Sequence, residues 1–212
     1  MPPRSRLDAD ERTAIIRAAY ACLSAPHAGP VSLAAILDGA GLSTRAFYRH
    51  FGSKDELFLA MLRRDSEAVA RRLKTLAELT PGGPVAQLRA WVDHILGLAY
   101  DPQSRTHAVV LGSDEVRLAK GYRDADAQLR AGRERVLADL LRRGRDEGLF
   151  PLARPDLDAA AIHALVDRAF AAPTLDVAPQ REQLVDYIVD FALRALGARR
   201  RDEFVPGERS DQ

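Results

Sequence analysis

Apolar residues recur along most of the chain at the three- and four-residue spacing of amphipathic helices. The first such stretch has an apolar face made of Ile16, Ala19, Tyr20 and Leu23, and Asp8 is expected to cap its start. Strand-like alternation of β-branched and polar residues is nearly absent. The pattern therefore predicts an all-α protein.

Glycine, proline and capping residues divide this pattern into separate helices. Ser32 and Ser43 are expected to cap two short helices joined by a glycine turn, and a capping box at Ser53 opens a long helix that runs to about Leu79. Further helices are predicted over roughly 84–100, 104–119, 121–147, 156–172 and 180–197. The polar tail from 199 to 212 is predicted to be disordered.

Charge favours nucleic-acid binding only locally. The chain has 31 basic and 30 acidic residues, a formal net charge of +1, so no global excess of positive charge attracts DNA. The stretch from residue 43 to residue 54 nevertheless contains no acidic residue. Its basic residues are Arg45, Arg49, His50 and Lys54. Arg4 and Arg6 precede the first helix and are expected to form a basic arm.

Residues 32–51 have the plan of a helix-turn-helix, which is two short helices joined by a glycine-containing turn. The inward face of the second helix is expected to carry Leu42, Ala46 and Phe47. The opposite face carries Thr44, Arg45, Tyr48 and Arg49, whose hydroxyl and guanidinium groups suit base edges and phosphates. Spacing alone does not distinguish two interpretations, a DNA-binding surface and an ordinary solvated face rich in arginine, and the two are evenly balanced.

A longer motif favours DNA binding. The order Ala-Gly-x-Ser, then Tyr-x-His-Phe-x-Ser-Lys-x-x-Leu, is complete at Ala40, Gly41, Ser43, Tyr48, His50, Phe51, Ser53, Lys54 and Leu57. On these residues the segment 10–62 resembles the N-terminal domain of TetR-family repressors. The resemblance implies a three-helix DNA-binding head over 1–58, followed by a helical effector-binding and dimerisation domain over 59–198.

The same resemblance implies roles for individual residues of the head. Phosphate contacts are expected from the positions of Ser32, Tyr48, His50 and Lys54, and base contacts from Thr44 and Arg45. Together with the exposed face derived above, the predicted DNA-binding residues are Ser32, Ser43, Thr44, Arg45, Tyr48, Arg49, His50 and Lys54. The expected partner is a double-stranded DNA operator.

Beyond residue 65 the resemblance is one of architecture, and it implies an effector pocket and a homodimer interface. Candidate pocket residues are Trp91, His94, Tyr100, His107, Tyr122 and Arg168, although any one of them alone is more often a core or surface residue. Candidate interface residues on the last two helices are Ala161, Leu165, Leu184, Ile188, Phe191 and Ala195. Packing of these faces on the chain's own core is the alternative.

Other classes of function lack support in the sequence. There is no glycine-rich phosphate loop, nucleophile elbow or His-Glu-x-x-His motif, so no enzyme activity and no cofactor is predicted. The single cysteine excludes an internal disulfide and a multi-cysteine metal site, and the spacing of His94 and His107 fixes no metal geometry, so no metal is predicted. No apolar run reaches the roughly 18 residues of a membrane-spanning helix, and a cytoplasmic location is expected.

The function predicted from the sequence is that of a DNA-binding transcriptional regulator, most simply a homodimeric repressor that a small-molecule effector releases from its operator. An effector would act by favouring a dimer whose two heads are wrongly spaced for DNA. Two alternatives remain open: a DNA-binding regulator without an effector, and a non-catalytic helical protein-interaction module.

Overall fold

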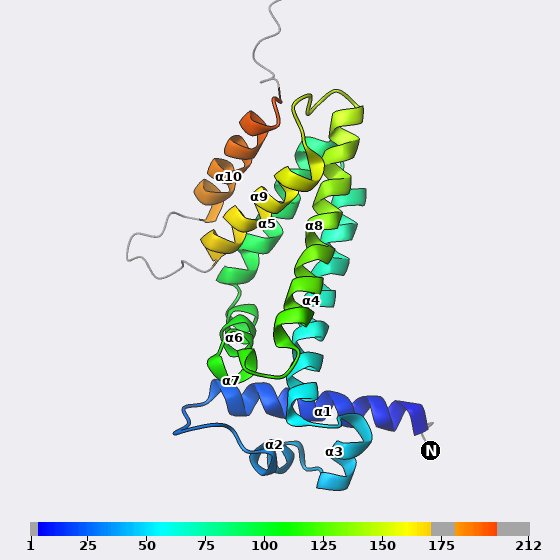
Figure 1. The fold of residues 1–212 in the computed structure, drawn as a ribbon, viewed down its shortest axis with the longest axis vertical. Helices are drawn as coiled ribbons and strands as arrows, with labels where there is room; N and C mark the ends of the chain where they lie inside the picture. The colour runs from blue at the N-terminus through cyan, green and yellow to red at the C-terminus, as the bar shows by residue number, and fades with distance from the viewer. Residues whose placement is uncertain (1–3, 171–180, 199–212) are drawn as a thin grey trace, which may run out of the picture. The chain divides into compact units, whose positions relative to one another are not determined.

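The computed structural model describes residues 4–170 and 181–198, and their side chains from Leu7 onward. Within these residues the chain forms helices and no strand, which confirms the all-α class (Figure 1). The helices are α1 Arg4–Ser24, α2 Leu33–Ala40, α3 Thr44–His50, α4 Lys54–Leu79, α5 Gly83–Tyr100, α6 Pro102–Leu111, α7 Asp114–Arg117, α8 Tyr122–Asp146, α9 Pro155–Phe170 and α10 Arg181–Ala195. None of these helices is both long and apolar enough to cross a membrane.

The helices divide into two compact units. The first comprises Met1–Arg72 with Leu98–Arg133, and the second comprises Leu73–Gly97 with Glu134–Gln212. The functional boundary expected after residue 58 falls inside α4 and stays a prediction. The predicted disordered tail, 199–212, lies outside the described residues.

Most helix boundaries lie within two residues of their predicted positions, and three predictions are wrong. Helix α1 begins at Arg4, so Asp8 lies inside the helix and is no cap, and Arg4 and Arg6 belong to the helix and form no separate arm. No glycine or proline between residues 4 and 8 stops the helix from extending backwards.

The single helix predicted over 104–119 is also wrong, because the structure has two helices, α6 and α7, in its place. The break falls at Gly112 and Ser113. The hydroxyl of Ser113 donates a hydrogen bond of 2.7 Å to the carbonyl of Val110, and Ser113 itself has an extended backbone at the start of α7. A serine that binds the preceding turn in this way competes with helix continuation.

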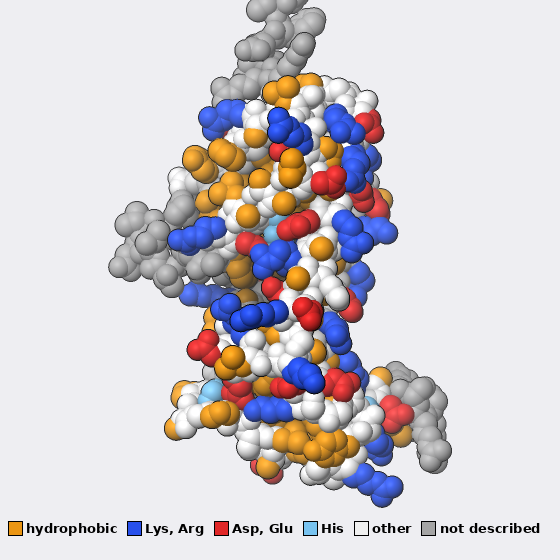
Figure 2. Space-filling view, in the orientation of Figure 1, with side chains coloured by type: hydrophobic (Ala, Val, Ile, Leu, Met, Phe, Trp, Pro, Cys, Tyr) orange, Lys and Arg blue, Asp and Glu red, His pale blue; other side chains and the backbone are white. Residues whose placement is uncertain are grey.

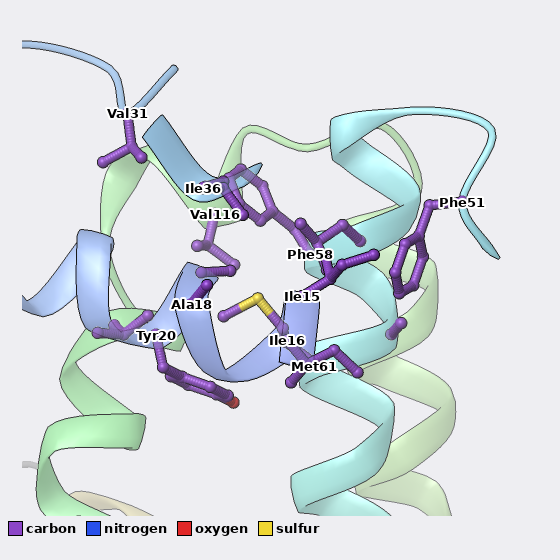
Figure 3. Packing of buried hydrophobic residues seen from close by; sticks show 14 of the residues in the cluster. Ile15, Ile16, Ala18, Tyr20, Val31, Ile36, Phe51, Phe58, Met61 and Val116 are labelled. Carbon is purple, nitrogen blue, oxygen red and sulfur yellow. The ribbon is translucent and has the colours of Figure 1, made fainter. Parts of the chain in front are cut away.

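The core of the first unit joins α1, α2, α3 and the start of α4 to α7 (Figure 3). Ile15 and Ile16 of α1 are 0% and 1% exposed, and Val116 of α7 is completely buried in the same cluster. Phe47 of α3 is also completely buried there. The short helices α2 and α3 are therefore held by tertiary packing, which isolated helices of seven or eight residues require.

The core of the second unit includes the turn that joins α8 to α9. Phe150 is completely buried, and its backbone N–H donates a 3.0 Å hydrogen bond to the carbonyl of Gly144. A β-carbon added at Gly144 would lie 2.1 Å from the Phe150 ring. The missing side chain at residue 144 therefore makes the space that the Phe150 ring fills.

Candidate nucleic-acid interface

Two serine caps begin the helices of the helix-turn-helix in the first unit. The Ser32 hydroxyl accepts a 3.1 Å hydrogen bond from the N–H of Ala35 at the start of α2, and Ser43 accepts a 3.2 Å bond from Ala46 at the start of α3. Gly41 ends α2 in the left-handed conformation, with φ of 64°, which is the usual terminator of a helix before a tight turn. The predicted cap at Ser53 is also present, since its hydroxyl accepts from the N–H of Glu56.

Helix α3 has one buried and one exposed face, as predicted. Ala46 and Phe47 are 6% and 0% exposed, and Leu42 packs against the same core. The exposed face consists of Thr44, Arg45, Tyr48 and Arg49. Tyr48 is 59% exposed, so a large aromatic ring with a hydroxyl is accessible on this face. Ser32 and Ser43, also predicted DNA contacts, are exposed as well.

Arg49 of this face and the predicted contact His50 are both paired with an acid that the sequence pattern did not reveal. Glu11 of α1 accepts hydrogen bonds from Arg49 at 2.5 Å and from His50 at 2.9 Å, both to the same carboxylate oxygen. The Arg49 side chain stays 53% exposed, whereas the His50 side chain is only 8% exposed. Arg49 thus remains accessible at the surface, and His50 mainly attaches α3 to α1.

The hydrogen bonds from His50 and Arg49 change the pKa of the Glu11 carboxyl group. Its pKa lies below the ordinary value of 4.5, first because of the hydrogen bond from His50 and then because of the one from Arg49. Asp8 lies nearby, and one ligand atom each of Asp8, Glu11 and His50 fall within 4.8 Å of one another. A metal ion there would face the Arg49 guanidinium on the same carboxylate oxygen, so the cluster fits an ion-pair network better than a cation site.

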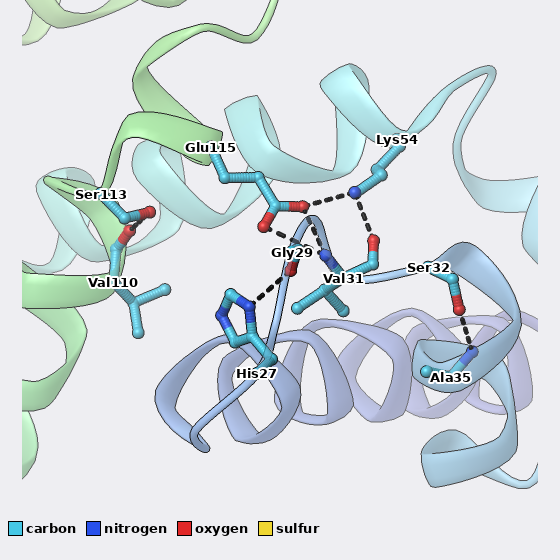
Figure 4. Close-up of polar contacts among 9 residues, drawn as sticks. All are labelled: His27, Gly29, Val31, Ser32, Ala35, Lys54, Val110, Ser113 and Glu115. Carbon is cyan, nitrogen blue, oxygen red and sulfur yellow. Dashed lines mark hydrogen bonds and ion pairs between the residues drawn. The ribbon is translucent and has the colours of Figure 1, made fainter.

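Lys54, the last predicted phosphate contact, is also engaged within the chain (Figure 4). Its ammonium forms a 2.5 Å ion pair with Glu115 of α7 and donates a hydrogen bond to the carbonyl of Val31. The Lys54 side chain is 28% exposed. Acidic and basic side chains are interspersed on the face of the molecule shown in Figure 2, in keeping with the net charge of +1.

The predicted pocket residues fall into both units. Trp91, His94 and Arg168 belong to the second unit, whereas Tyr100, His107 and Tyr122 belong to the first. Trp91 is completely buried and its Nε1 has no hydrogen-bond partner among the described residues, while its ring meets that of His163 edge-on at 6.0 Å.

The other pocket candidates have visible structural roles or are exposed. His107 stacks on Tyr20 and bonds Asp65 at 2.7 Å. The Tyr122 hydroxyl donates to the carbonyl of Leu111 at 3.2 Å, and Tyr100 is 47% exposed. Arg168 is exposed on α9.

The predicted dimer residues differ in exposure within the second unit. Phe191 is 50% exposed, Ala161 and Ala195 are exposed, and Leu165 and Leu184 are partly covered. Ile188 is only 1% exposed and packs inside its own unit, so its assignment to an exposed interface is corrected. The sequence analysis missed Tyr187 and Leu157, which are 63% and 67% exposed on the same two helices.

A capped helix-turn-helix followed by further helices defines the helix-turn-helix class of DNA-binding proteins. Residues 15–61 match the family described as bacterial regulatory proteins, tetR family. The HTH-type transcriptional repressor KstR2 of Mycobacterium tuberculosis (strain CDC 1551 / Oshkosh) is 30% identical over 134 residues, 62% of this chain. The match spans 63% of the length of that repressor.

Solved structures show the same fold over most of the chain. The SmeT–triclosan complex is 25% identical with a TM-score of 0.73, covering 95% of this chain and 98% of that chain. AibR in complex with isovaleryl coenzyme A and operator DNA is 18% identical with a TM-score of 0.64, covering 85% of this chain and 97% of that chain. The head of this chain therefore matches the TetR family, and its remaining helices have the same fold as these solved regulators.

Proposed function

We propose that this protein is a transcriptional repressor that binds a double-stranded DNA operator through α3. The observation that carries the proposal is the exposed face of α3. That face presents Thr44, Arg45, Tyr48 and Arg49, while Ala46 and Phe47 fix the helix to the core from behind. A rigidly held helix with hydroxyl and guanidinium groups on its outer face suits the major groove.

Within this surface, Arg45 is the proposed base-reading residue. It is exposed in the first turn of α3, and no acidic partner is found for it among the described side chains. Arg49, by contrast, is shared with Glu11. A guanidinium that binds none of the described carboxylates has its donors available for the N7 and O6 atoms of guanine.

The test is selection of bound sequences from a random duplex pool, followed by titration of the selected operator at several salt concentrations. The wild-type chain should select a defined sequence, with an affinity that falls steeply as salt rises. Arg45→Ala should relax the preference at one or two base pairs, at about 1–3 kcal/mol for each lost contact. Arg105→Ala, the same change at an exposed position on α6, is the matched control and should leave the preference intact. A wild-type chain that ignores duplex DNA at low salt contradicts the proposal.

We further propose that the operator complex contains a homodimer. Support comes from the apolar side chains exposed on α9 and α10, among them Leu157, Tyr187 and Phe191. Exposed apolar groups of this kind on adjacent helices are typical of a protein interface. A two-fold dimer would also supply the two heads that a palindromic operator requires.

Release by a small molecule is the third part of the proposal. In their solved structures, SmeT is bound to triclosan and AibR is bound to isovaleryl coenzyme A. The buried indole N–H of Trp91, which has no partner within the described part of the chain, is a donor that a ligand acceptor could satisfy. Trp91 is also the single tryptophan of the chain, so its fluorescence is an unambiguous probe. A compound that both shifts this fluorescence and releases the protein from the operator is the expected effector. If no compound in a broad library does both, an effector-independent regulator is favoured.

A further inference from the structure

The two ends of the helix-turn-helix meet at one polar ring. Val31 lies two residues before the start of α2, and Lys54 is the first residue of α4, so these two residues bracket the whole α2–α3 segment. The Lys54 ammonium donates to the Val31 carbonyl and closes this segment on itself. Because both ends of the segment are fixed at one place, whatever holds that place also orients α3.

Glu115 of α7 holds both ends of the segment at once. Its two carboxylate oxygens accept hydrogen bonds from the Val31 N–H at 3.0 and 3.2 Å, and one of them forms the 2.5 Å ion pair with Lys54. Val31, Glu115 and Lys54 thus form a closed ring, hereafter the Glu115 ring (Figure 4). The next residue on α7, Val116, is completely buried in the core beneath it (Figure 3). Adjacent polar and apolar contacts therefore fasten α7 to the helix-turn-helix.

The ring uses most of the hydrogen-bonding capacity of Lys54. An ammonium has three donors, and two are taken by Val31 and Glu115. The same ammonium lies 5.2 Å from the centre of the Phe58 ring, a cation–π distance. The Lys54 and Glu115 side chains are 28% and 16% exposed, so removal of either partner would leave the other charge partly buried and uncompensated.

We propose that Glu115 is a positioning residue for operator binding, which acts by fixing Val31 and Lys54 and through them the orientation of α3. The role of Lys54 is then to complete the Glu115 ring, and it does not contact a DNA phosphate. This inference rests on the proposed function, because its consequence is a change in operator affinity. It assigns to α7, outside the head, an indirect part in DNA recognition through the orientation of α3.

A double-mutant cycle separates this role from a phosphate contact. The variants are Lys54→Met, which keeps most of the aliphatic stem, Glu115→Ala and the double variant. Each single variant should weaken operator binding by roughly tenfold, a factor typical of residues in one hydrogen-bond network, and the double variant should be no weaker than either. The salt dependence should stay unchanged in all three. If Lys54 instead contacts a phosphate, Lys54→Met lowers the salt slope by about one and Glu115→Ala strengthens binding by freeing the lysine, and this result would overturn the proposal.

The neighbouring acid supplies a matched control. Asp114 is exposed on the same short helix, and its side chain takes no part in the ring. Asp114→Ala removes the same charge one residue away, so it should leave operator affinity within about twofold of wild type. An Asp114→Ala effect equal to that of Glu115→Ala would show that net charge, and not the ring, determines affinity.

A measurement without DNA tests the ring itself. Amide hydrogen exchange at Val31 should accelerate at least tenfold in Glu115→Ala, because its N–H loses its acceptor. The amide N–H of Phe51 donates to the Phe47 carbonyl at 2.9 Å. This amide should stay protected from exchange, which would show that α3 remains folded. Unchanged exchange at Val31 would contradict the ring. A wild-type chain that binds no operator would defeat the proposed function, and the exchange measurement would still decide whether Glu115 holds Val31.

Discussion

The rings of Tyr20 and His107 lie nearly parallel, with their centres 3.9 Å apart and their planes inclined by 10°. Both side chains also bind one oxygen of Asp65, the Tyr20 hydroxyl at 2.9 Å and the His107 ring nitrogen at 2.7 Å. The three residues come from α1, α6 and α4. They form a second polar attachment of the head helices to α6, distinct from the Glu115 ring.

Removing the Tyr20 hydroxyl should destabilise the first unit. Tyr20→Phe deletes one hydrogen bond to a carboxylate at a site where the ring is only 7% exposed, so the free energy of unfolding should fall by about 1–2 kcal/mol. Urea titration measures this loss. Tyr187→Phe, at a residue that is 63% exposed, is the control and should change stability little. Equal effects of the two substitutions would argue against the Asp65 attachment.

The same tyrosine should make stability depend on alkaline pH. Burial raises the pKa of Tyr20 above its ordinary value of 10, and the negative charge of Asp65 raises it further. A group whose pKa is raised by folding contributes stability that is present below its unfolded pKa and is lost as pH rises above it. The wild-type chain should therefore lose stability above about pH 10 more steeply than Tyr20→Phe. Parallel pH profiles for the two proteins would be inconsistent with a buried, neutral Tyr20.

Neighbouring residues on α3 should separate folding from recognition. Phe47→Ala removes a completely buried ring, so it should cost about 3–5 kcal/mol of stability and abolish operator binding by unfolding the head. Tyr48→Ala, at a residue that is 59% exposed, should change stability by less than about 1 kcal/mol and yet weaken binding. Thermal unfolding and operator titration of both variants give the comparison. Full operator affinity in a folded Tyr48→Ala protein would remove Tyr48 from the DNA surface.

The proposed dimer predicts different outcomes at two positions of α10. Phe191→Asp places a charge on a half-exposed apolar side chain and should yield a folded monomer in sedimentation experiments. Ile188→Asp should instead unfold the second unit, because Ile188 is 1% exposed. Leu118→Asp, at a residue that is 84% exposed, is the control and should leave the mass unchanged. An unaltered mass for Phe191→Asp would place the interface elsewhere.

Local sequence signals predicted the local structure well. The serine caps, the glycine turn at Gly41 and the inward face of α3 all follow from residues a few positions apart, and all are present. The break between α6 and α7 was missed because glycine and serine also occur inside helices. Neither Gly112 nor Ser113 therefore marks a helix end by its residue type alone. In the structure, the hydroxyl bond to Val110 and the extended backbone of Ser113 mark the end of the helix.

Partners that lie far apart in the sequence could not be predicted in this way. Glu11 is 38 positions from Arg49, and Glu115 is 61 positions from Lys54, so the stretch that contains no acid is partly neutralised in the folded chain. On α10 the apolar residues occupy more than one face. Periodicity could therefore not distinguish Ile188, which packs inward, from Phe191, which does not.

The close fit of Phe150 against the bare backbone of Gly144 has a consequence for the tolerance of the chain to variation. Even alanine at position 144 would overlap the ring at 2.1 Å, so the smallest possible side chain should be as damaging as a large one. If residue 144 is replaced by each of the other amino acids in turn, the loss of stability should therefore not increase with side-chain size, as it would at an ordinary buried position. Natural relatives that carry any other residue there should have a smaller residue in place of the phenylalanine.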